Sequence, residues 1–363
     1  MSEDEKLRVQ LLIPQLNTGG IQKMVVDLAE NLLKLGMTVQ IVCFGPKVGG
    51  LFEQKAEEKH IDVRYLGKRS GMDLTIIPKI YRAMKQFKPD VVHGHQRAFT
   101  YALLPTVLCG VKSRVYTIHN LAEKDTWGIQ RPILRCAIRI FGVRLVAISD
   151  ICKRSAVKLY HQTPDRVACI YNGIDTAAFR APENTERKKE NFVAVGRLSP
   201  QKNPQLMLRA FKTAHAQYPG AALCMLGDGK LRPELEQYIH DNGLTDSVRL
   251  EGDVSDVRPF LHQAGSYLMS SDYEGLPVAV LEAMAAGLPI LSTKAGGVPD
   301  IVWDHKNGLL VDVGDEQGLA DAMLTLLRDP EMQRNMAEES EKLALNYDIM
   351  NCARSYVEVY RQC

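Results

Sequence analysis

Short apolar runs rich in β-branched residues alternate with longer amphipathic segments along almost the whole chain, and this alternation limits the folds open to it. In the first half, runs such as LRVQLLIP (7–14) and TVQIVCF (38–44) alternate with segments such as IPKIYRAMKQFKPD (77–90). A similar series begins at NFVAVGRL (191–198). Strands of about five residues that alternate with helices of about 10 to 15 predict parallel sheets with helices on both faces. We therefore expect an α/β protein of two doubly wound, Rossmann-like domains, with ligands at the carboxyl ends of strands in a cleft between the domains.

A polar, charged stretch separates the two series. It reads NGIDTAAFRAPENTERKKEN (172–191), contains few apolar side chains and is interpreted as a linker. A chain of 363 residues is long enough to form two hydrophobic cores. The sequence predicts an N-terminal domain over residues 1–180, a C-terminal domain over 181–345, and a final helix over 346–363 that packs back on the N-terminal domain.

The small net charge of +2 hides an asymmetry between the halves. Residues 1–180 carry 27 Lys and Arg against 16 Asp and Glu, whereas residues 181–363 carry 18 against 27. A basic half attracts phosphates, anionic lipid or an anionic polymer, although a solvated basic face without a partner fits equally.

Composition also bears on location and metal binding. The acidic start of the chain lacks the pattern of a secretory signal, and the longest nearly uncharged apolar stretch, 98–111, is too short to span a bilayer. We therefore expect a cytoplasmic protein. The eight cysteines show no CxxC pair or zinc spacing and are interpreted as reduced thiols. The chain contains no Asp-x-Asp pair, and we expect no metal site and no cofactor.

Two glutamates in the stretch EGLPVAVLEAMAAGLP (274–289) are the first candidate site residues. Gly275 and Leu276 are predicted at a helix N-terminus, where free N–H groups suit an anion. If the intervening residues were helical at about 1.5 Å per residue, Glu274 and Glu282 would lie roughly 12 Å apart, comparable to the span from a nucleotide's ribose to a sugar beyond its diphosphate. The alternative, a helix-terminal charge and a solvated helix residue, fits the spacing as well.

The same stretch, continued to ILSTKAGGVPDIV, resembles the Glu-x7-Glu signature of retaining glycosyltransferases of the GT-B fold, family 4. Further motifs of that family occur in its order and at its spacings, so that the resemblance covers essentially the whole chain. These motifs are Gly19-Gly20 after the first strand, TIHN (117–120), YNGID (171–175), VAVGRLSPQKN (193–203), GDG (227–229) and LEGDV (250–254).

The resemblance implies roles for particular residues. Glu274 would bind hydroxyls of the transferred sugar, Glu282 the ribose hydroxyls, and Arg197 with Lys202 the diphosphate. His119 would contact the sugar without acting as a base. The expected catalytic set is His119, Arg197, Lys202 and Glu274; the donor-binding set is Gly20, Gly227, Gly252, Gly275, Leu276 and Glu282; the acceptor-binding set is His95 and Asn172.

Plainer interpretations of four residues stay open. Gly20 also fits an ordinary turn from strand to helix. His93 and His95 also fit two alternating side chains at a strand end, and His119 also fits a strand-end residue bonded to backbone.

Two basic segments bear on membrane association. They are IPKIYRAMKQFK, with Lys79, Arg82, Lys85 and Lys88, and GIQRPILRCAIRIFGVR, with Arg131, Arg135, Arg139 and Arg144. A cationic face beside an apolar one is typical of a helix lying on a membrane surface, and equally of a solvated face over a core. Because relatives with lipid-linked acceptors dock through their N-terminal domain, the resemblance favours peripheral association at the inner face of the membrane.

The resemblance thus implies a metal-independent, retaining hexosyltransferase. Its donor would be a nucleotide diphosphate sugar, expected to be UDP-linked and to carry a hexose or N-acetylhexosamine. Its acceptor would be a glycan or a lipid-linked molecule, held by the N-terminal domain, in the assembly of a bacterial cell-surface polysaccharide or glycolipid. No nucleic acid partner is expected. A nucleotide-sugar 2-epimerase and a non-catalytic nucleotide-sugar-binding scaffold are the alternatives. The donor sugar and base, the acceptor, the linkage and the oligomeric state are not readable from the sequence.

Overall fold

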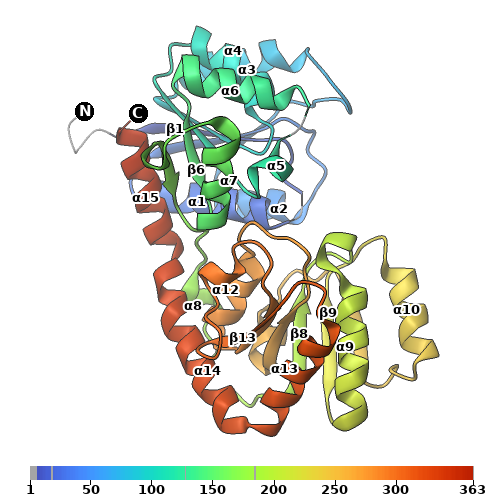
Figure 1. Cartoon of the computed structure of the whole chain (residues 1–363). Coiled ribbons are helices and arrows are strands. Elements are labelled where there is room, and N and C mark those ends of the chain that lie inside the picture. The colour runs from blue at the N-terminus through green and yellow to red at the C-terminus, as the bar shows by residue number, and fades with distance from the viewer. Residues whose placement is uncertain (1–5, 18, 127, 184, 363) are drawn as a thin grey trace. The chain divides into compact units, whose positions relative to one another are not determined.

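A computed structural model of the chain describes residues 6–17, 19–126, 128–183 and 185–362 and divides them into two compact units (Figure 1). One unit is Met1–Ile174 together with Ile349–Cys363, and the other is Asp175–Asp348. The chain therefore crosses between units at 174/175, six residues before the predicted boundary at 180/181, and returns after 348. The acidic start of the chain and Cys363 lie outside the described residues. No described helix has the length and apolar character needed to cross a membrane.

The N-terminal unit, within these residues, is a seven-stranded parallel sheet covered by helices. Its strands are β1 (Arg8–Ile13), β2 (Thr38–Cys43), β3 (Asp62–Tyr65), β4 (Val91–His95), β5 (Ser113–Ile118), β6 (Arg144–Ala147) and β7 (Val167–Cys169). Its helices are α1 (Gly20–Lys34), α2 (Leu51–Glu58), α3 (Ile76–Phe87), α4 (Phe99–Leu108), α5 (Ala122–Asp125), α6 (Gln130–Phe141), α7 (Asp150–Tyr160), the short η1 (Pro164–Arg166) and α15 (Ile349–Arg361).

The strand order of this sheet is β3-β2-β1-β4-β5-β6-β7, so the direction of winding reverses between β1 and β4. Helix α1 buries Val25, Leu28 and Leu32 against the sheet, as their spacing of three and four residues predicts. Gly36 follows α1 with φ +83°, a conformation that glycine adopts without strain and that ends the helix.

Helix α15 belongs to the core of the N-terminal unit, although it comes last in the chain. It packs against α1 and β5, and its tyrosines Tyr356 and Tyr360 are buried. The N–H of Ile349 donates to the carbonyl of Ile174 at 2.8 Å, where the helix begins. A side chain at Gly173 would collide with the backbone of Ile349, so glycine permits this close contact.

The C-terminal unit is a six-stranded parallel sheet, again within the described residues. Its strands are β8 (Lys188–Val195), β9 (Ala222–Leu226), β10 (Val248–Gly252), β11 (Ala264–Met269), β12 (Ile290–Thr293) and β13 (Gly308–Val311). Its helices are α8 (Thr176–Phe179), η2 (Pro200–Lys202), α9 (Pro204–Gln217), α10 (Arg232–Asp241), α11 (Arg258–Gln263), α12 (Val278–Ala285), η3 (Val298–Asp300), α13 (Glu316–Arg328), α14 (Pro330–Ala344) and η4 (Leu345–Tyr347).

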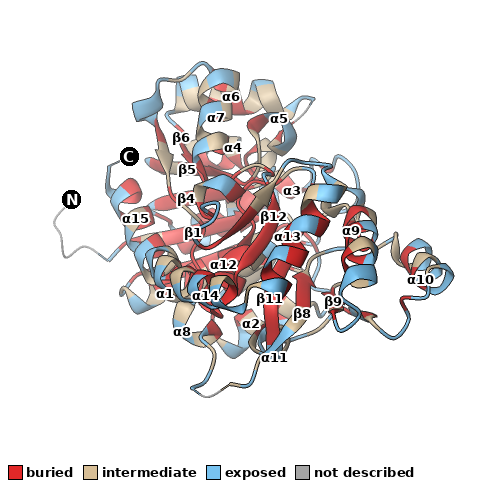
Figure 2. Cartoon of the chain, turned by 60° about the horizontal axis from the view of Figure 1, so that its bottom comes forward, coloured by how far each residue is buried: buried red, intermediate tan, exposed pale blue. Residues whose placement is uncertain are grey.

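The order of this second sheet is β10-β9-β8-β11-β12-β13, with the reversal between β8 and β11. Its strands are largely buried while the outer faces of its helices are exposed, as Figure 2 shows for β8, β11 and α13. Parallel strands covered on both faces are expected to read as continuous apolar runs, as NFVAV and SYLM do here. The two parallel sheets confirm the predicted fold class of two doubly wound α/β domains.

Candidate functional site

The loops after β8 and β11 meet at the point where the C-terminal sheet reverses its winding. In doubly wound sheets, ligands bind outside the carboxyl ends of the strands at this point. A hollow with a cavity volume of about 30 Å³ lies between the two loops. The polar or glycine residues that line it are Gly196, Arg197, Lys202, Ser270 and Ser271.

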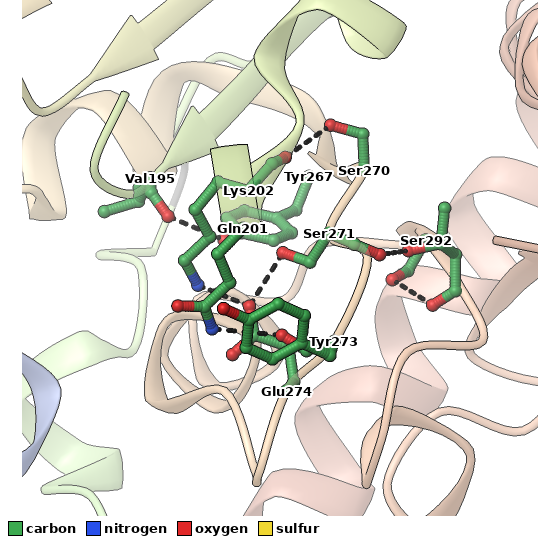
Figure 3. A network of polar contacts seen from close by, with 10 residues as sticks. Val195, Gln201, Lys202, Tyr267, Ser270, Ser271, Tyr273, Glu274 and Ser292 are labelled. Carbon is green, nitrogen blue, oxygen red and sulfur yellow. Dashed lines mark hydrogen bonds and ion pairs between the residues drawn. The ribbon is translucent and has the colours of Figure 1, made fainter. Parts of the chain in front are cut away.

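Lys202 and Glu274 form an ion pair beside this hollow (Figure 3). Lys202 Nζ lies 2.5 Å from Glu274 Oε1, and the hydroxyl of Ser271 donates to the same oxygen at 2.7 Å. Glu274 is only 6% exposed, and the bonds from Lys202 and Ser271 compensate the burial of its charge. The two residues that the sequence assigned to the sugar and the diphosphate are thus brought together.

Hydrogen bonds to main-chain carbonyls join the same two loops (Figure 3). The side-chain amide of Gln201 donates to the carbonyl of Tyr273 at 3.0 Å, and the N–H of Asp272 donates to the carbonyl of Gln201 at 2.9 Å. Ser270 donates to the carbonyl of Lys202 at 2.9 Å. These bonds position Lys202 and Glu274 through the main chain, and a rigidly held pair is better organised for binding than one on free loops.

Arg197 differs from Lys202 because its guanidinium is exposed. Arg197 lines the hollow, and its side chain makes no ion pair or hydrogen bond with any described residue. A surface ion pair, the ordinary explanation for such an arginine, is therefore not its role among these residues. An exposed guanidinium beside a hollow is free to bind a phosphate through two parallel N–H donors.

Glu282 lies on α12 and is 6% exposed, so it is not a solvated helix residue. Tyr267 on β11 is influenced by Glu282. Burial of the tyrosine, the charge of Glu282 and the charge of Glu274 together raise its pKa. Its hydroxyl donates to the carbonyl of Val195 at 3.2 Å. Both glutamates therefore act electrostatically on one side chain at the end of the sheet. The estimate of their separation needs correction, because α12 begins only at Val278 and the preceding residues are not helical.

Glycines let the neighbouring loops approach one another. Gly227 has φ +117°, donates to the carbonyl of Gly252 at 2.7 Å, and a side chain there would collide with the carbonyl of Gly196. Gly252 has φ +76°. The carbonyl of Gly275 accepts from the N–H of Gly297 at 3.0 Å, and both Gly275 and Leu276 are buried. Of the predicted donor-binding glycines of this unit, Gly227 and Gly252 thus adopt backbone conformations that favour glycine, and their donor-binding role stays a prediction.

The other predicted residues belong to the N-terminal unit. Gly20 is exposed at the first position of α1, Asn172 is buried, and His95 is completely buried at the end of β4. His119 follows β5 and is 7% exposed. Its ring bonds to His95 (Nε2 to Nδ1, 3.0 Å) and its backbone N–H donates to Asp125 at 3.1 Å. The acceptor roles of His95 and Asn172 stay predictions, and the burial of His95 points to the different role argued below.

Burial sets the protonation state of these groups. It lowers the pKa of His119 to about 3, so that this ring is neutral at physiological pH. Burial also raises the pKa of Asp125 to about 6, against hydrogen bonds from Tyr116 and the backbone of His119 that lower it. A neutral imidazole donates or accepts hydrogen bonds without carrying charge, which agrees with a binding role for His119.

Several residues that shape the site were not singled out from the sequence. They are Ser271, which shares Glu274 with Lys202; Tyr267, beside both glutamates; and Gly296, whose φ of +56° places it against the backbone of Glu274. The available signals were weak, namely two serines closing the run SYLMSS and two glycines in KAGG. Among the described residues, no cluster of three or more His, Cys, Asp or Glu side chains is arranged to hold a metal ion.

Comparison with known proteins follows the two units. Residues 18–178 match the family model "Glycosyltransferase Family 4", and residues 175–343 match "Glycosyl transferases group 1". The D-inositol 3-phosphate glycosyltransferase of Corynebacterium urealyticum is 33% identical, over 95% of this chain and 91% of that protein. This chain belongs to glycosyltransferase family 4.

Other relatives of this family 4 glycosyltransferase include UDP-Gal:alpha-D-GlcNAc-diphosphoundecaprenol alpha-1,3-galactosyltransferase of Escherichia coli, which is 25% identical over 79% of each chain. Among solved structures, HepE of Anabaena in complex with UDP-glucose has a TM-score of 0.85 and 20% sequence identity, and the match covers 98% of this chain and all of HepE. At that identity the likeness shows the GT-B fold.

Proposed function

We propose that this glycosyltransferase transfers a hexose or N-acetylhexosamine from a UDP-sugar, with retention of anomeric configuration, to a glycan or lipid-linked acceptor. The observation that carries the proposal is that Arg197 and Lys202 line one hollow at the switch point of the C-terminal sheet, and that Lys202 is paired there with the buried carboxylate of Glu274. Two cations beside one carboxylate match a ligand with an anionic diphosphate at one end and hydroxyls at the other.

The diphosphate is the leaving group of the proposed reaction, and negative charge grows on it as its bond to the sugar breaks. Arg197 and Lys202 stabilise that charge in the transition state, where such stabilisation raises kcat. Glu274 accepts hydrogen bonds from hydroxyls of the transferred sugar, and Glu282 accepts them from the ribose. Lys202 lies 2.5 Å from Glu274, and we propose that it exchanges part of this contact for a phosphate oxygen of the donor.

Retention is proposed to proceed by attack on the face that the leaving group occupies. The acceptor oxygen forms its bond to the anomeric carbon as the bond from that carbon to the diphosphate breaks. The acceptor's proton passes to the departing phosphate oxygen. In this scheme the side chains of Arg197 and Lys202 supply the positive charge at the diphosphate, and we propose that turnover needs no metal ion.

The choice of uridine rests on relatives. The Escherichia coli relative is named for a UDP-linked galactose donor, and HepE was solved with UDP-glucose. The same Escherichia coli name describes a sugar on diphosphoundecaprenol as acceptor, which supports a lipid-linked acceptor in the assembly of a bacterial surface polysaccharide or glycolipid. The cytoplasmic location expected from the sequence stays a prediction.

The proposal is tested by turnover of a panel of UDP-hexoses and UDP-N-acetylhexosamines in EDTA. Each is incubated alone and with α-linked N-acetylglucosamine on a polyprenyl diphosphate. Release of UDP and a new α-glycosidic bond, read from the anomeric proton coupling, are expected with one donor. Conversion of the donor to its 2-epimer without release of UDP would identify an epimerase instead. Binding of UDP without turnover of any donor would identify a scaffold.

The N-terminal unit also carries a surface suited to a lipid-linked acceptor. Helix α4 packs against both α3 and α6 (Figure 1). It exposes Leu104 and Leu108, at 56% and 62%. Helix α3 adds the exposed basic side chains Lys79, Arg82 and Lys85, followed by Lys88. The cationic face predicted on α6 contains fewer exposed arginines than expected. Arg131 and Arg135 are half-buried and donate to backbone carbonyls. We propose that α4 and its basic neighbour α3 contact an anionic membrane surface.

Charge introduced on α4 is expected to weaken this contact. The double variant Leu104→Glu/Leu108→Glu should bind vesicles of phosphatidylglycerol and phosphatidylcholine about tenfold less in a sedimentation assay, because two apolar contacts are replaced by repelled charges. Val313→Glu, at a similarly exposed position of the C-terminal unit, is the matched control. Equal sedimentation of all three proteins would exclude α4 as the contact surface.

A further inference from the structure

Imidazole rings and hydroxyl groups form a buried polar array in the N-terminal unit, on the sheet face that α15 covers. None of its members is more than 7% exposed, and each makes a hydrogen bond with another member. The members are His93 and His95 of β4, Thr117 and His119 at the end of β5, and Tyr356 and Tyr360 of α15. His119 is the most exposed of these rings, at 7%, and it is bonded to His95 of the buried array.

All three imidazoles are neutral. Burial lowers the pKa of His93 and His95 well below the usual value, with a further contribution from the neighbouring imidazoles, and it lowers that of His119 to about 3. A neutral imidazole has one N–H donor and one lone-pair acceptor. A hydrogen bond between two such rings therefore fixes which nitrogen of each ring carries the proton.

The bond between His95 and His119 joins Nδ1 of the first ring to Nε2 of the second at 3.0 Å. The remaining nitrogen of His95, Nε2, is buried without a hydrogen-bond partner among the described residues. A buried N–H without a partner is rarer than a buried acceptor without one, because the unmade donor bond is costly. The proton of His95 therefore sits on Nδ1, which donates to His119 Nε2.

It follows that His119 carries its own proton on Nδ1. This nitrogen has no hydrogen-bond partner among the described residues and is not one of the fully buried polar atoms. His119 thus presents an N–H donor outward, whatever the pH between about 5 and 8. A hydroxyl oxygen of a sugar is an acceptor that such a donor can bind.

The C-terminal helix α15 contacts the array through the hydroxyls of Tyr356 and Tyr360. The hydroxyl of Tyr360 lies 2.7 Å from His93 Nδ1, and Thr117 Oγ1 lies 2.7 Å from His93 Nε2 and 3.1 Å from the hydroxyl of Tyr356. With both nitrogens of His93 engaged, its ring is fixed. The centroid of that ring lies 4.1 Å from the centroid of His95, so the ring of His95 is held against it by packing.

We propose that His95 is a positioning residue that holds His119 in the tautomer with its proton on Nδ1, and that Tyr360 of α15 supports it through His93. The first part concerns the protein alone. Its consequence for activity rests on the proposed function, in which His119 contacts a sugar hydroxyl. In place of the acceptor contact expected from the sequence, His95 acts through His119.

Nitrogen-15 NMR of the full-length protein with labelled histidine tests the tautomer directly. Two-bond proton–nitrogen correlations of the His119 ring, assigned with His119→Gln, are expected to show protonated Nδ1 and unprotonated Nε2. His95→Leu should release the ring into a mixture of tautomers. His95→Asn should restore the wild-type pattern, because the amide nitrogen of Asn is attached to Cγ, as Nδ1 of histidine is, and can donate in its place. A protonated Nε2 in the wild type, or an unchanged pattern in His95→Leu, would overturn the inference.

The role of α15 is tested by Tyr360→Phe, with Tyr160→Phe as the matched control. Tyr160 is equally buried in the same unit, and among the described residues its hydroxyl bonds only to Thr126, at 2.6 Å. Tyr360→Phe should add a second population of His95 and His119 ring signals, whereas Tyr160→Phe should leave these signals unchanged. Identical spectra of the two variants would remove Tyr360 from the proposal.

Activity separates this inference from the proposed function. For a UDP-sugar that the wild type turns over, His95→Leu should lower kcat about tenfold, the effect of one hydrogen bond, with the donor KM within about threefold and with recovery in His95→Asn. Protonated Nδ1 with no turnover of any UDP-sugar would support the tautomer and reject the proposed function. Turnover of a UDP-sugar by a wild type in which Nε2 of His119 is protonated would support the proposed function and reject the tautomer.

Discussion

Replacing Lys202 by methionine is expected to lower kcat/KM for the UDP-sugar donor by about 100-fold to 1,000-fold, the effect of losing one preorganised charge from a developing anion. Methionine keeps most of the length and the apolar stem of lysine but removes the cation that lies 2.5 Å from Glu274. The measurement is UDP release at saturating acceptor and varied donor. The loss should appear mainly in kcat, because the interaction strengthens as the diphosphate leaves.

Two further variants separate the loss of the Lys202 charge from a general effect of removing a lysine and from a loss of stability. Lys212→Met removes an exposed lysine of the same unit that donates to Asn242, and it should retain wild-type kinetics. Lys202→Met also leaves the buried Glu274 without its cation, which destabilises the fold. The double variant Lys202→Met/Glu274→Gln removes the uncompensated charge and should recover stability but not activity. Activity of Lys202→Met within threefold of wild type would refute the role of Lys202.

Gly296→Ala is expected to lower donor turnover about 100-fold through a shift of the backbone. A Cβ at this position would overlap the carbonyl oxygen of Glu274, a main-chain atom that cannot rotate away. The loop carrying Glu274 must therefore move, and a displacement of about 1 Å at a reacting group can lower the rate about 100-fold. We also expect unfolding in urea to show a loss of at least about 2 kcal/mol, because overpacking adds to the strain of alanine at φ +56°.

Gly243→Ala separates the collision from the strain. Gly243 has φ +65° and no atom near the position that a Cβ would take, so alanine there carries the backbone penalty alone. It should unfold slightly more easily than wild type, by about 1 kcal/mol, with normal turnover. If Gly296→Ala behaved like Gly243→Ala, the close packing of Gly296 on Glu274 would have no functional consequence.

The fold was largely predictable because its information is local. Runs such as NFVAV and the spacing of Val25, Leu28 and Leu32 report burial residue by residue, and alternation of strands with helices determines the parallel class. Arg197 and Lys202 were predicted from the resemblance to the family's GRL and KN motifs, and Glu274 from that resemblance together with its place before a predicted helix. The loops that carry these residues meet at the switch point, in agreement with the general rule for such sheets.

The remainder depends on contacts between distant segments, which no local pattern encodes. Ser271 was not identified because its role exists only in the bond to Glu274, and Gly296 because its neighbour in space is 22 residues earlier in the chain. The assumed helix from Glu274 to Glu282 was wrong because Pro277 stands at the N-cap and the residues before it form a loop. The imidazole array was not predicted for the same reason. The tyrosines of α15 that bond to Thr117 and His93 lie 239 and 267 residues later in the chain.

We propose above all that the loops after β8 and β11 bind a nucleoside diphosphate. Calorimetric titration of UDP, with GDP and ADP as competitors for the same hollow, measures this directly. The wild type should bind one UDP per chain in preference to GDP and ADP, and Lys202→Met should bind it at least about tenfold more weakly. Absence of binding by all three nucleotides, or equal affinity of wild type and Lys202→Met, would contradict the claim.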